Sequence, residues 1–296
     1  MHTPPRRLGT IGSAVTALSA LLVLVAGCSA GGSSDAAGPS PASSSPTAPA
    51  PSAPSSTDAS TYVALGDSYT AGPGIAPDQA NAGLCGRSSA NWPTRLAASL
   101  DLTLTDLSCS GATTADLSTT LGSGTVPADA GLVTVSAGGN DGGLFLSLIQ
   151  ACTVSVQQCS SYVDDEAPAI LERTTGDLVA LLRKAGTTAP GARVVLVGYP
   201  RIMPSTGTCE AAGIVAGDVT SVVTAETALD AALARAAEQA GVDYVSLRGP
   251  SEGHDACAGD EAWTNGASPK AGDGIVFHPT ARGMTAVADL VAAAVR

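Results

Sequence analysis

The 296-residue sequence is poor in aromatic side chains, in basic side chains and in histidine. Phe, Trp and Tyr make up 3% of it, His occurs three times, and 14 Lys and Arg face 26 Asp and Glu. The formal net charge is −12. An acidic surface of this kind repels nucleic acid and gives no basic patch for anionic lipid headgroups. The composition therefore argues against nucleic-acid binding and against membrane attachment through surface charge.

The cysteines and histidines lack the spacing of metal ligands. The sequence has no Cys-x-x-Cys motif and no paired histidines, so we expect neither a metal nor another cofactor. Beyond residue 28 the cysteine count is even, which suits disulfides in an oxidising compartment, and the six are Cys85, Cys109, Cys152, Cys159, Cys209 and Cys257. Spacing alone favours only the local link between Cys152 and Cys159.

The N-terminal segment has the form of an export signal. Arg6 and Arg7 precede an apolar stretch, residues 11–26, that is too short to span a bilayer comfortably. It ends in Val-Ala-Gly-Cys, which resembles a bacterial lipobox, so residues 1–27 are predicted to be a lipoprotein signal peptide and Cys28 the lipidated residue. An ordinary signal peptide with an incidental cysteine is the alternative. The arginine pair leaves both the general and the twin-arginine export routes open.

The next segment, residues 28–60, is composed almost wholly of Ser, Ala, Pro, Gly and Thr. Such a sequence cannot bury enough apolar surface to fold, so we expect a disordered tether. Removal of residues 1–27 takes two of the 14 basic side chains and no acidic one, which lowers the net charge to −14. The expected location is the outer face of the bacterial cytoplasmic membrane, through the lipid anchor, or the exterior of the cell as a secreted protein.

Residues 61–296 are long enough for one domain with a full core. Short β-rich runs alternate with longer segments rich in Ala and Leu, and the runs lie at 61–66, 103–108, 131–137, 193–199 and 242–247. This alternation predicts an α/β fold in which helices cover both faces of a central parallel sheet. We expect the domain to be a monomer.

Helix signals support the same architecture. One helix is predicted to open near Asp164 and Asp165, with Pro168 in its first turn, and to end just before Gly186. Two more are predicted at 219–240 and 280–294, each with an apolar stripe that would pack on the sheet.

Polar motifs follow three of the predicted strands. Ser68, within Gly-Asp-Ser-Tyr-Thr, follows the first; Gly111 follows the second; Asn140, within Gly-Gly-Asn-Asp, follows the third. Ligands of open parallel sheets bind at the carboxyl ends of the strands, so these positions favour a functional site. Each motif alone also has a structural interpretation: an Asp-Ser turn at Ser68, braced by Asp67, and a helix entry with Asn140 or Asp141 as N-cap.

Ser68, Gly111, Asn140 and His278, in this order, resemble the SGNH or GDSL-type hydrolases, a family of esterases and lipases. The resemblance covers nearly all of residues 61–296 and is greatest to the secreted actinobacterial esterases and lipases. It implies a flavodoxin-like, three-layer α/β/α fold and disulfides that pair Cys85 with Cys109, Cys152 with Cys159, and Cys209 with Cys257.

The resemblance also implies a mechanism. Ser68 would attack an ester carbonyl, and His278 would take the serine proton and return it to the leaving alcohol. The oxyanion hole would be formed by the backbone N–H groups of Ser68 and Gly111 and the side-chain amide of Asn140. The expected substrate is a small-molecule or lipid ester whose acyl chain is either lipid-like or short.

The choice of base follows by elimination, because only His254 and His278 lie beyond the signal segment. His254 lies in a predicted loop near Cys257, where local hydrogen bonding is the expected role. His278 precedes Pro279 and the last predicted helix, whose positive end favours a neutral imidazole. We therefore expect His278 to be the base.

The group that orients His278 departs from the most familiar pattern of the family. That pattern has an aspartate three residues before the histidine, where this sequence has Ile275. Asp273 lies nearby, but Asp-Gly is a strong turn dipeptide. The main-chain carbonyl of Ile275 or Val276 is the alternative, so a catalytic dyad is favoured over a triad.

Three alternative functions fit the sequence less well. An α/β-hydrolase elbow requires Gly-x-Ser-x-Gly, and Thr70 occupies the position of its last glycine. A noncatalytic surface lipoprotein that binds a cell-wall or lipid ligand is a second alternative, although all four chemical positions are present. An esterase that deacetylates polysaccharides is the third.

Overall fold

Five parallel strands form the centre of residues 61–296, the part of the chain that the computed structural model describes. They are β1 (Thr61–Gly66), β2 (Thr103–Asp106), β3 (Leu132–Ser136), β4 (Arg193–Val197) and β5 (Asp243–Val245), in the spatial order β2-β1-β3-β4-β5. All neighbouring pairs are parallel. The predicted parallel sheet is confirmed, and apart from β1 its strands are shorter than predicted.

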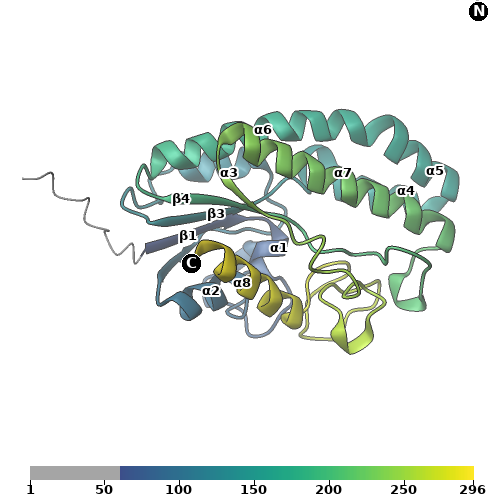
Figure 1. The fold of residues 1–296 in the computed structure, drawn as a ribbon. Helices are drawn as coiled ribbons and strands as arrows, with labels where there is room; N and C mark the ends of the chain where they lie inside the picture. Colours follow the sequence, from purple (N-terminus) through teal and green to yellow (C-terminus); the bar gives the residue numbers. More distant parts are fainter. Residues whose placement is uncertain (1–60) are drawn as a thin grey trace, which may run out of the picture. The chain divides into compact units, whose positions relative to one another are not determined.

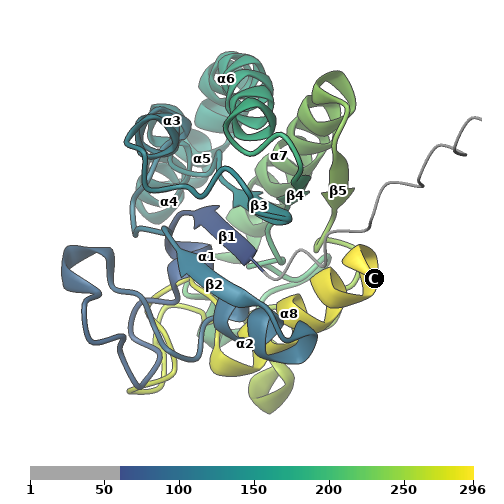
Figure 2. The ribbon, with the colours of Figure 1, turned by 90° about the vertical axis from the view of Figure 1, so that its left-hand side faces the viewer.

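Helices cover both faces of this sheet (Figures 1 and 2). One face carries α3 (Thr114–Gly122), α4 (Leu144–Val154), α5 (Val156–Ser161), α6 (Ala167–Thr188) and α7 (Ala216–Ala240). The other carries α2 (Trp92–Leu100) and α8 (Ala281–Val295). The predicted three-layer α/β/α fold is therefore confirmed.

Strand β1 is continuously apolar because both of its faces are buried by helices. Tyr62, Val63, Ala64 and Leu65 have no exposed surface, because alternate side chains enter the two helical layers. Val63 and Leu65 join the core under the larger group of helices, whereas Tyr62 and Ala64 join the core under α2 and α8. The strand is thus fixed from both sides at the point where the chain reaches Ser68.

Helix α6 differs from its prediction at both ends. A π-helical turn, Tyr162–Glu166, precedes it, so the α-helix proper begins at Ala167. It also continues through Gly186 to Thr188 instead of ending before the glycine. Ala185 and Ala189 on either side of Gly186 are fully buried, and this packing offsets the roughly 1 kcal/mol that a glycine costs inside a helix.

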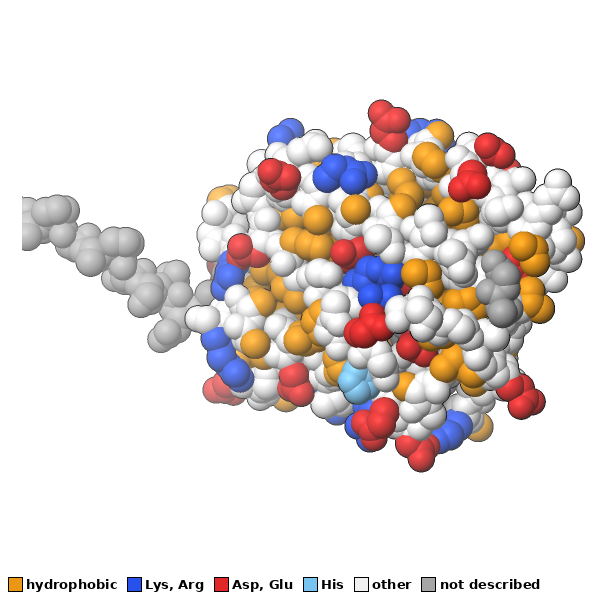
Figure 3. Space-filling view, turned by 45° about the vertical axis from the view of Figure 1, so that its right-hand side comes forward, with side chains coloured by type: hydrophobic (Ala, Val, Ile, Leu, Met, Phe, Trp, Pro, Cys, Tyr) orange, Lys and Arg blue, Asp and Glu red, His pale blue; other side chains and the backbone are white. Residues whose placement is uncertain are grey.

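Short helical turns complete the fold. Helix α1 (Ser68–Ala71) directly follows β1, and four 3-10 turns lie at Gly83–Cys85, Asp141–Gly143, Glu210–Ala212 and Gly259–Glu261. On the face shown in Figure 3, basic side chains lie singly or beside acidic ones. No helix among residues 61–296 is both long and apolar enough to cross a membrane.

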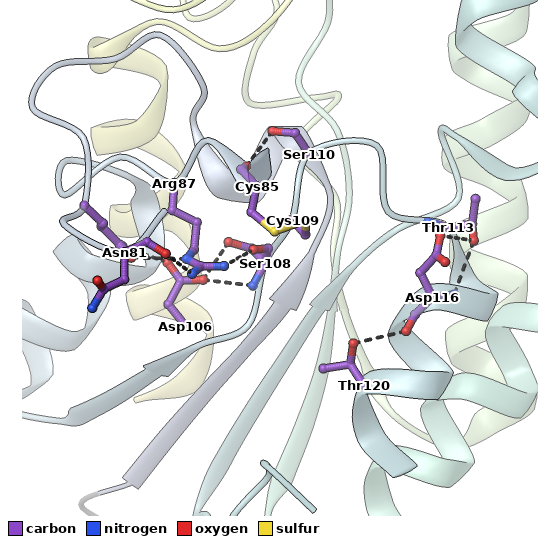
Figure 4. Close-up of a disulfide and its surroundings, with 11 residues drawn as sticks. Asn81, Cys85, Arg87, Asp106, Ser108, Cys109, Ser110, Thr113, Asp116 and Thr120 are labelled. Atoms are coloured by element: carbon purple, nitrogen blue, oxygen red, sulfur yellow. Dashed lines mark hydrogen bonds between the residues drawn. A yellow bond between two sulfur atoms is a disulfide. The ribbon is translucent and has the colours of Figure 1, made fainter. Parts of the chain in front are cut away.

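Three disulfides join Cys85 to Cys109, Cys152 to Cys159, and Cys209 to Cys257, the pairs that the family resemblance implies. The first ties the loop after α1 to the loop after β2 (Figure 4). Beside it, the Ser110 hydroxyl donates a hydrogen bond of 2.8 Å to the Cys85 carbonyl. This disulfide therefore holds the segment that leads to Gly111. The signal peptide, Cys28 and the tether lie outside the described residues and stay predictions.

Candidate active site

The four residues singled out in the sequence meet in one cavity of about 440 Å³. Ser68, Gly111 and Asn140 come from the carboxyl ends of β1, β2 and β3, and His278 comes from the loop before α8. This is the edge of a parallel sheet where ligands bind. A larger groove of about 750 Å³, which Leu171 of α6 and Ala228 of α7 help to line, contains none of the four.

The turn from β1 into α1 presents Ser68. Asp67 is the N-cap of α1, and its Oδ1 accepts a hydrogen bond of 2.9 Å from the backbone N–H of Tyr69. Gly66 is needed for close approach, because a Cβ there would lie 2.1 Å from the Thr70 hydroxyl oxygen. Ser68 Oγ lies 2.8 Å from His278 Nε2. A serine and an imidazole in this contact are what nucleophilic catalysis requires.

The other ring nitrogen of His278 fixes its tautomer. Nδ1 lies 2.8 Å from the carbonyl oxygen of Val276, which can only accept, so Nδ1 carries the hydrogen and Nε2 faces Ser68 with a free lone pair. Burial lowers the pKa of His278 below its ordinary value. The imidazole is therefore neutral at neutral pH, as a general base must be.

Of the three groups considered for orienting the ring, the structure places the Val276 carbonyl at Nδ1. The Ile275 carbonyl instead accepts a hydrogen bond of 3.1 Å from the backbone N–H of His278. The Asp273 carboxylate accepts one of 2.6 Å from the backbone N–H of Ala281, at the beginning of α8. The Asp273 carboxylate therefore serves the N-terminus of the last helix, where the free N–H groups favour a negative charge, while the Val276 carbonyl serves the ring.

Gly111 and Asn140 lie where their N–H groups can serve an anion. Gly111 has a φ of +80°, a conformation that favours glycine. One N–H of the Asn140 amide donates a hydrogen bond of 3.1 Å to the Ala112 carbonyl, which fixes the amide and leaves its second N–H for a ligand.

The two loops that carry Gly111 and Asn140 are tied together. Asp141 accepts hydrogen bonds from the backbone N–H of Thr114, at 3.2 Å and 3.3 Å, and from the Thr114 hydroxyl. Asn140 occupies the N-cap position of the turn Asp141–Gly143, as the helix-entry interpretation expects, but its side chain makes no capping hydrogen bond there. The helix entry and a role of the amide in the site are therefore compatible.

Sequence reasoning missed two tyrosines. The Tyr69 hydroxyl donates a hydrogen bond of 2.5 Å to the carbonyl of Phe277, the residue before His278. The Tyr199 hydroxyl donates one of 2.6 Å to Asp67 Oδ2. The two rings contact edge to face, with centroids 5.1 Å apart. Tyr69 lies inside the Gly-Asp-Ser-Tyr-Thr motif and Tyr199 lies just after β4. Their positions at strand ends are the only features of the sequence that could have indicated a place in the site.

The carboxyl group of Asp67 is unusual for its burial. The residue is 1% exposed, and loss of solvation raises its pKa to about 7. The hydrogen bonds from Tyr199 and from the Tyr69 backbone oppose this shift, because they stabilise the ionised form.

Apart from Ser110, the rest of the cavity is apolar. Its lining is formed by side chains from the beginning of α4, from the loop after β4 and from the loop of His278, and these are Phe145, Leu146, Ile149, Ile202, Ile275, Val276 and Phe277. Leu146 is 66% exposed, Ile275 40% and Val276 43%. The sequence did not predict this lining, because its members come from three segments far apart in the chain.

His254 lies outside the cavity. Its Nδ1 is 2.8 Å from the Glu261 carbonyl oxygen, and its ring stacks on Trp263 with centroids 4.6 Å apart. These contacts correspond to the local structural role predicted for it.

Comparison with known proteins gives a consistent assignment. Residues 64–286 match the GDSL-like lipase/acylhydrolase family. The chain is 38% identical over 223 residues to "Lipase 2" of Streptomyces coelicolor, covering 68% of this chain and 74% of that protein. It is 30% identical over 237 residues to a lipase of Streptomyces rimosus, covering 77% and 83%.

Solved structures agree. Phospholipase A1 from Streptomyces albidoflavus superposes with a TM-score of 0.71 at 30% identity, covering 80% of this chain and 99% of that one. The extracellular lipase of Streptomyces rimosus has a TM-score of 0.64 at 29% identity, with coverage of 80% and 99%.

Proposed function

Because the chain belongs to the GDSL-like lipase/acylhydrolase family and is a serine hydrolase of carboxylic esters, we propose that Ser68 is its nucleophile and His278 its general base. The observation that carries this proposal is the 2.8 Å contact between Ser68 Oγ and His278 Nε2 inside an apolar cavity. The lipase names of the relatives favour hydrolysis over a role in ligand binding alone.

In the first half of the reaction, Ser68 Oγ bonds to the ester carbonyl carbon while its proton passes to His278 Nε2. The carbonyl oxygen becomes an oxyanion, and it accepts hydrogen bonds from the N–H groups of Ser68 and Gly111 and from the free N–H of Asn140. When the C–O bond to the alcohol breaks, the alcohol takes the proton from Nε2 and an acyl-Ser68 ester remains.

In the second half, a water molecule takes the place of the alcohol. His278 removes one proton from the water, whose oxygen bonds to the acyl carbon. Collapse of this intermediate returns the proton to Ser68 Oγ and releases the carboxylic acid. The Val276 carbonyl supports the imidazolium in both halves, so a dyad suffices.

We propose that the preferred substrates carry lipid-type acyl chains. The apolar lining supports this choice, and so does its charge: among residues 61–296, Asp67 is the one charged side chain in the lining, and it is buried. A sugar polymer would need polar side chains that bind its hydroxyl groups, and the lining offers few of them, so the polysaccharide deacetylase alternative is less well supported.

The proposal extends to location and assembly. Three disulfides suit an exported protein, and the lipobox-like segment suits a lipid anchor at Cys28 on the outer face of the membrane. We propose that the catalytic domain acts there as a monomer.

The experiment that tests the proposed roles is active-site labelling. A fluorophosphonate is expected to label Ser68 in the purified protein, and Ser68→Ala is expected to abolish both the label and the hydrolysis of p-nitrophenyl esters. Labelling of another residue, or full activity of Ser68→Ala, would contradict the proposal.

A further inference from the structure

Tyr199 links the two sides of the proposed site. It lies two residues after β4 and is 8% exposed. Its hydroxyl donates to Asp67 Oδ2 at 2.6 Å and accepts from the backbone N–H of Gly139 at 3.1 Å. Asp67 directly precedes Ser68, and Gly139 directly precedes Asn140. A single hydroxyl thus joins the nucleophile turn to the loop of the third oxyanion donor.

The directions of these hydrogen bonds are fixed by the donors available. The Gly139 N–H can only donate, so the one hydrogen of the Tyr199 hydroxyl is left for Asp67. Burial, followed by the nearby charge of Asp67, holds the pKa of Tyr199 well above its ordinary value, so the hydroxyl keeps this hydrogen. Asp67 Oδ1 accepts from the Tyr69 N–H. Both carboxylate oxygens are therefore acceptors, an arrangement that favours the ionised form.

The loop of Asn140 is seated closely on aromatic rings. A Cβ added at Gly139 would lie 2.6 Å from the Phe145 ring and 3.3 Å from the Tyr199 hydroxyl. Phe145 and Tyr199 pack edge to face, with centroids 5.6 Å apart. The rings limit how near the loop can come, and the hydrogen bond to the Tyr199 hydroxyl holds it at that distance.

We propose that Tyr199 is a positioning residue: through Asp67 it holds the Gly139–Asn140 backbone at the distance from Ser68 that the oxyanion requires. The inference rests on the proposed roles of Ser68 and Asn140. It is Asn140 that contacts the reacting atoms, and Tyr199 acts through Gly139. If the Asn140 donor is displaced by a fraction of an ångström, the oxyanion of the transition state is stabilised less, whereas binding of the uncharged ester is unchanged.

The first test is Tyr199→Phe, which keeps the ring and removes both hydrogen bonds. We expect kcat to fall by about tenfold or more, towards the loss expected for an oxyanion donor, while KM changes by less than about twofold. KM is expected to hold because the apolar lining is unchanged.

Tyr62→Phe is the matched control. The Tyr62 hydroxyl is equally buried and shares a hydrogen bond of 2.8 Å with Thr134 Oγ1, but its side chain packs in the core on the other face of the sheet. Both Tyr62→Phe and Tyr199→Phe are expected to lower the melting temperature. Only Tyr62→Phe is expected to leave kcat unchanged.

The second test is Asp67→Asn, which imitates the protonated carboxyl and leaves a single acceptor oxygen for the two donors, the Tyr69 N–H and the Tyr199 hydroxyl. The groups that face this carboxyl are Tyr69 of α1, Tyr199 after β4 and Asp141 after β3, with Glu226 of α7 acting on Tyr69. In the wild type, kcat is expected to fall as pH decreases through about 7, where Asp67 gains its proton. In Asp67→Asn the maximal kcat is lower and the remaining acid limb, due to His278, lies at lower pH.

The inference is overturned if Tyr199→Phe keeps kcat within about twofold of the wild type, or if Tyr62→Phe loses as much. It is also overturned if kcat of Asp67→Asn falls at the same acidic pH as kcat of the wild type. This second test can be read even if Tyr199→Phe does not fold. Fluorophosphonate labelling of wild-type Ser68 separates the two levels, since failure to label contradicts the proposed function itself.

Discussion

The imidazole of His278 donates its Nδ1 hydrogen to the carbonyl oxygen of Val276, two residues earlier in the same loop, at 2.8 Å. The proposed base is thus oriented by a backbone carbonyl of its own loop. The Asp273 carboxylate, which would complete a triad, bonds instead to the Ala281 N–H at 2.6 Å.

This arrangement predicts unequal effects of two substitutions. Asp273→Asn is expected to lower kcat by less than about threefold, because the amide oxygen can still accept from Ala281. His278→Ala removes the base and is expected to cost roughly 10³-fold or more. Steady-state kinetics on a p-nitrophenyl ester measures both, and comparable losses would restore Asp273 as the orienting acid.

Asn140→Ala is expected to lower kcat by roughly 10²- to 10³-fold, because one oxyanion donor is lost. Folding should be unaffected, since the side chain of Asn140 makes one hydrogen bond, to the Ala112 carbonyl, and its backbone hydrogen bond from Gly143 is kept in the variant. Asn81→Ala, at an exposed position, is the matched control and should behave as wild type. An Asn140→Ala enzyme of normal kcat would remove this residue from the site.

The raised pKa of Asp67 leads us to expect that a higher pH increases kcat but decreases the free energy of unfolding. The unfolded chain ionises this carboxyl near its ordinary pKa of 3.8, whereas the folded protein holds the proton up to about pH 7. Between these values the unfolded state binds fewer protons, so the stability contributed by Asp67 is present below pH 4 and is lost as pH rises to about 7.

Asp67→Asn lacks this loss. Relative to the wild type, its free energy of unfolding is expected to increase from pH 4 to pH 7 and to level off above that range. Urea titrations of both proteins at pH 4.5 and pH 8 measure the difference. A stability difference that is the same at both pH values would show that the carboxyl is not held protonated by burial.

The Cys85–Cys109 disulfide is expected to contribute about 3 kcal/mol to the free energy of unfolding, because it closes a loop with a sequence separation of 24. The double variant Cys85→Ala/Cys109→Ala should also lose activity, since the bridge supports the segment that leads to Gly111. Removal of the Cys152–Cys159 bridge, with a separation of 7, is the control and should destabilise less. Equal urea midpoints for the first double variant and the wild type would contradict the prediction.

Leu146→Asp is expected to change selectivity for acyl length. Leu146 lines the cavity and is 66% exposed, so a charge there should not prevent folding but should repel long acyl chains. Each buried CH₂ contributes about 0.8 kcal/mol, so kcat/KM for a decanoyl ester should fall by tenfold or more while that for an acetyl ester changes little. Leu84→Asp, on a fully exposed leucine outside the lining, is the control. A parallel loss on both esters would place the acyl chain elsewhere.

Sequence alone predicted the layers of the fold and brought Ser68, Gly111 and Asn140 to one edge of the sheet. It could do so because β-rich runs and strand-end positions are local features of the chain. Packing decided the rest. Helix α6 continues beyond Gly186 because the residues on either side of that glycine are buried. The choice of the Val276 carbonyl over that of Ile275 as the partner of His278 depends on the path of the loop. The hydroxyl of Tyr199 meets Asp67 across 132 residues, a contact that no local pattern predicts.

The hydrogen bond from Tyr69 to the Phe277 carbonyl joins residues 208 positions apart. Ser68 follows the first strand of the domain, whereas His278 precedes its last helix. A chain still being synthesised carries the serine long before the imidazole, and it stays chemically inert until the final segment docks. The same order means that one proteolytic cut between residues 270 and 277 would place the two members of the proposed dyad on different fragments. Hydrolytic activity during synthesis would thus report that the segment of His278 and α8 has been made and has docked on the sheet.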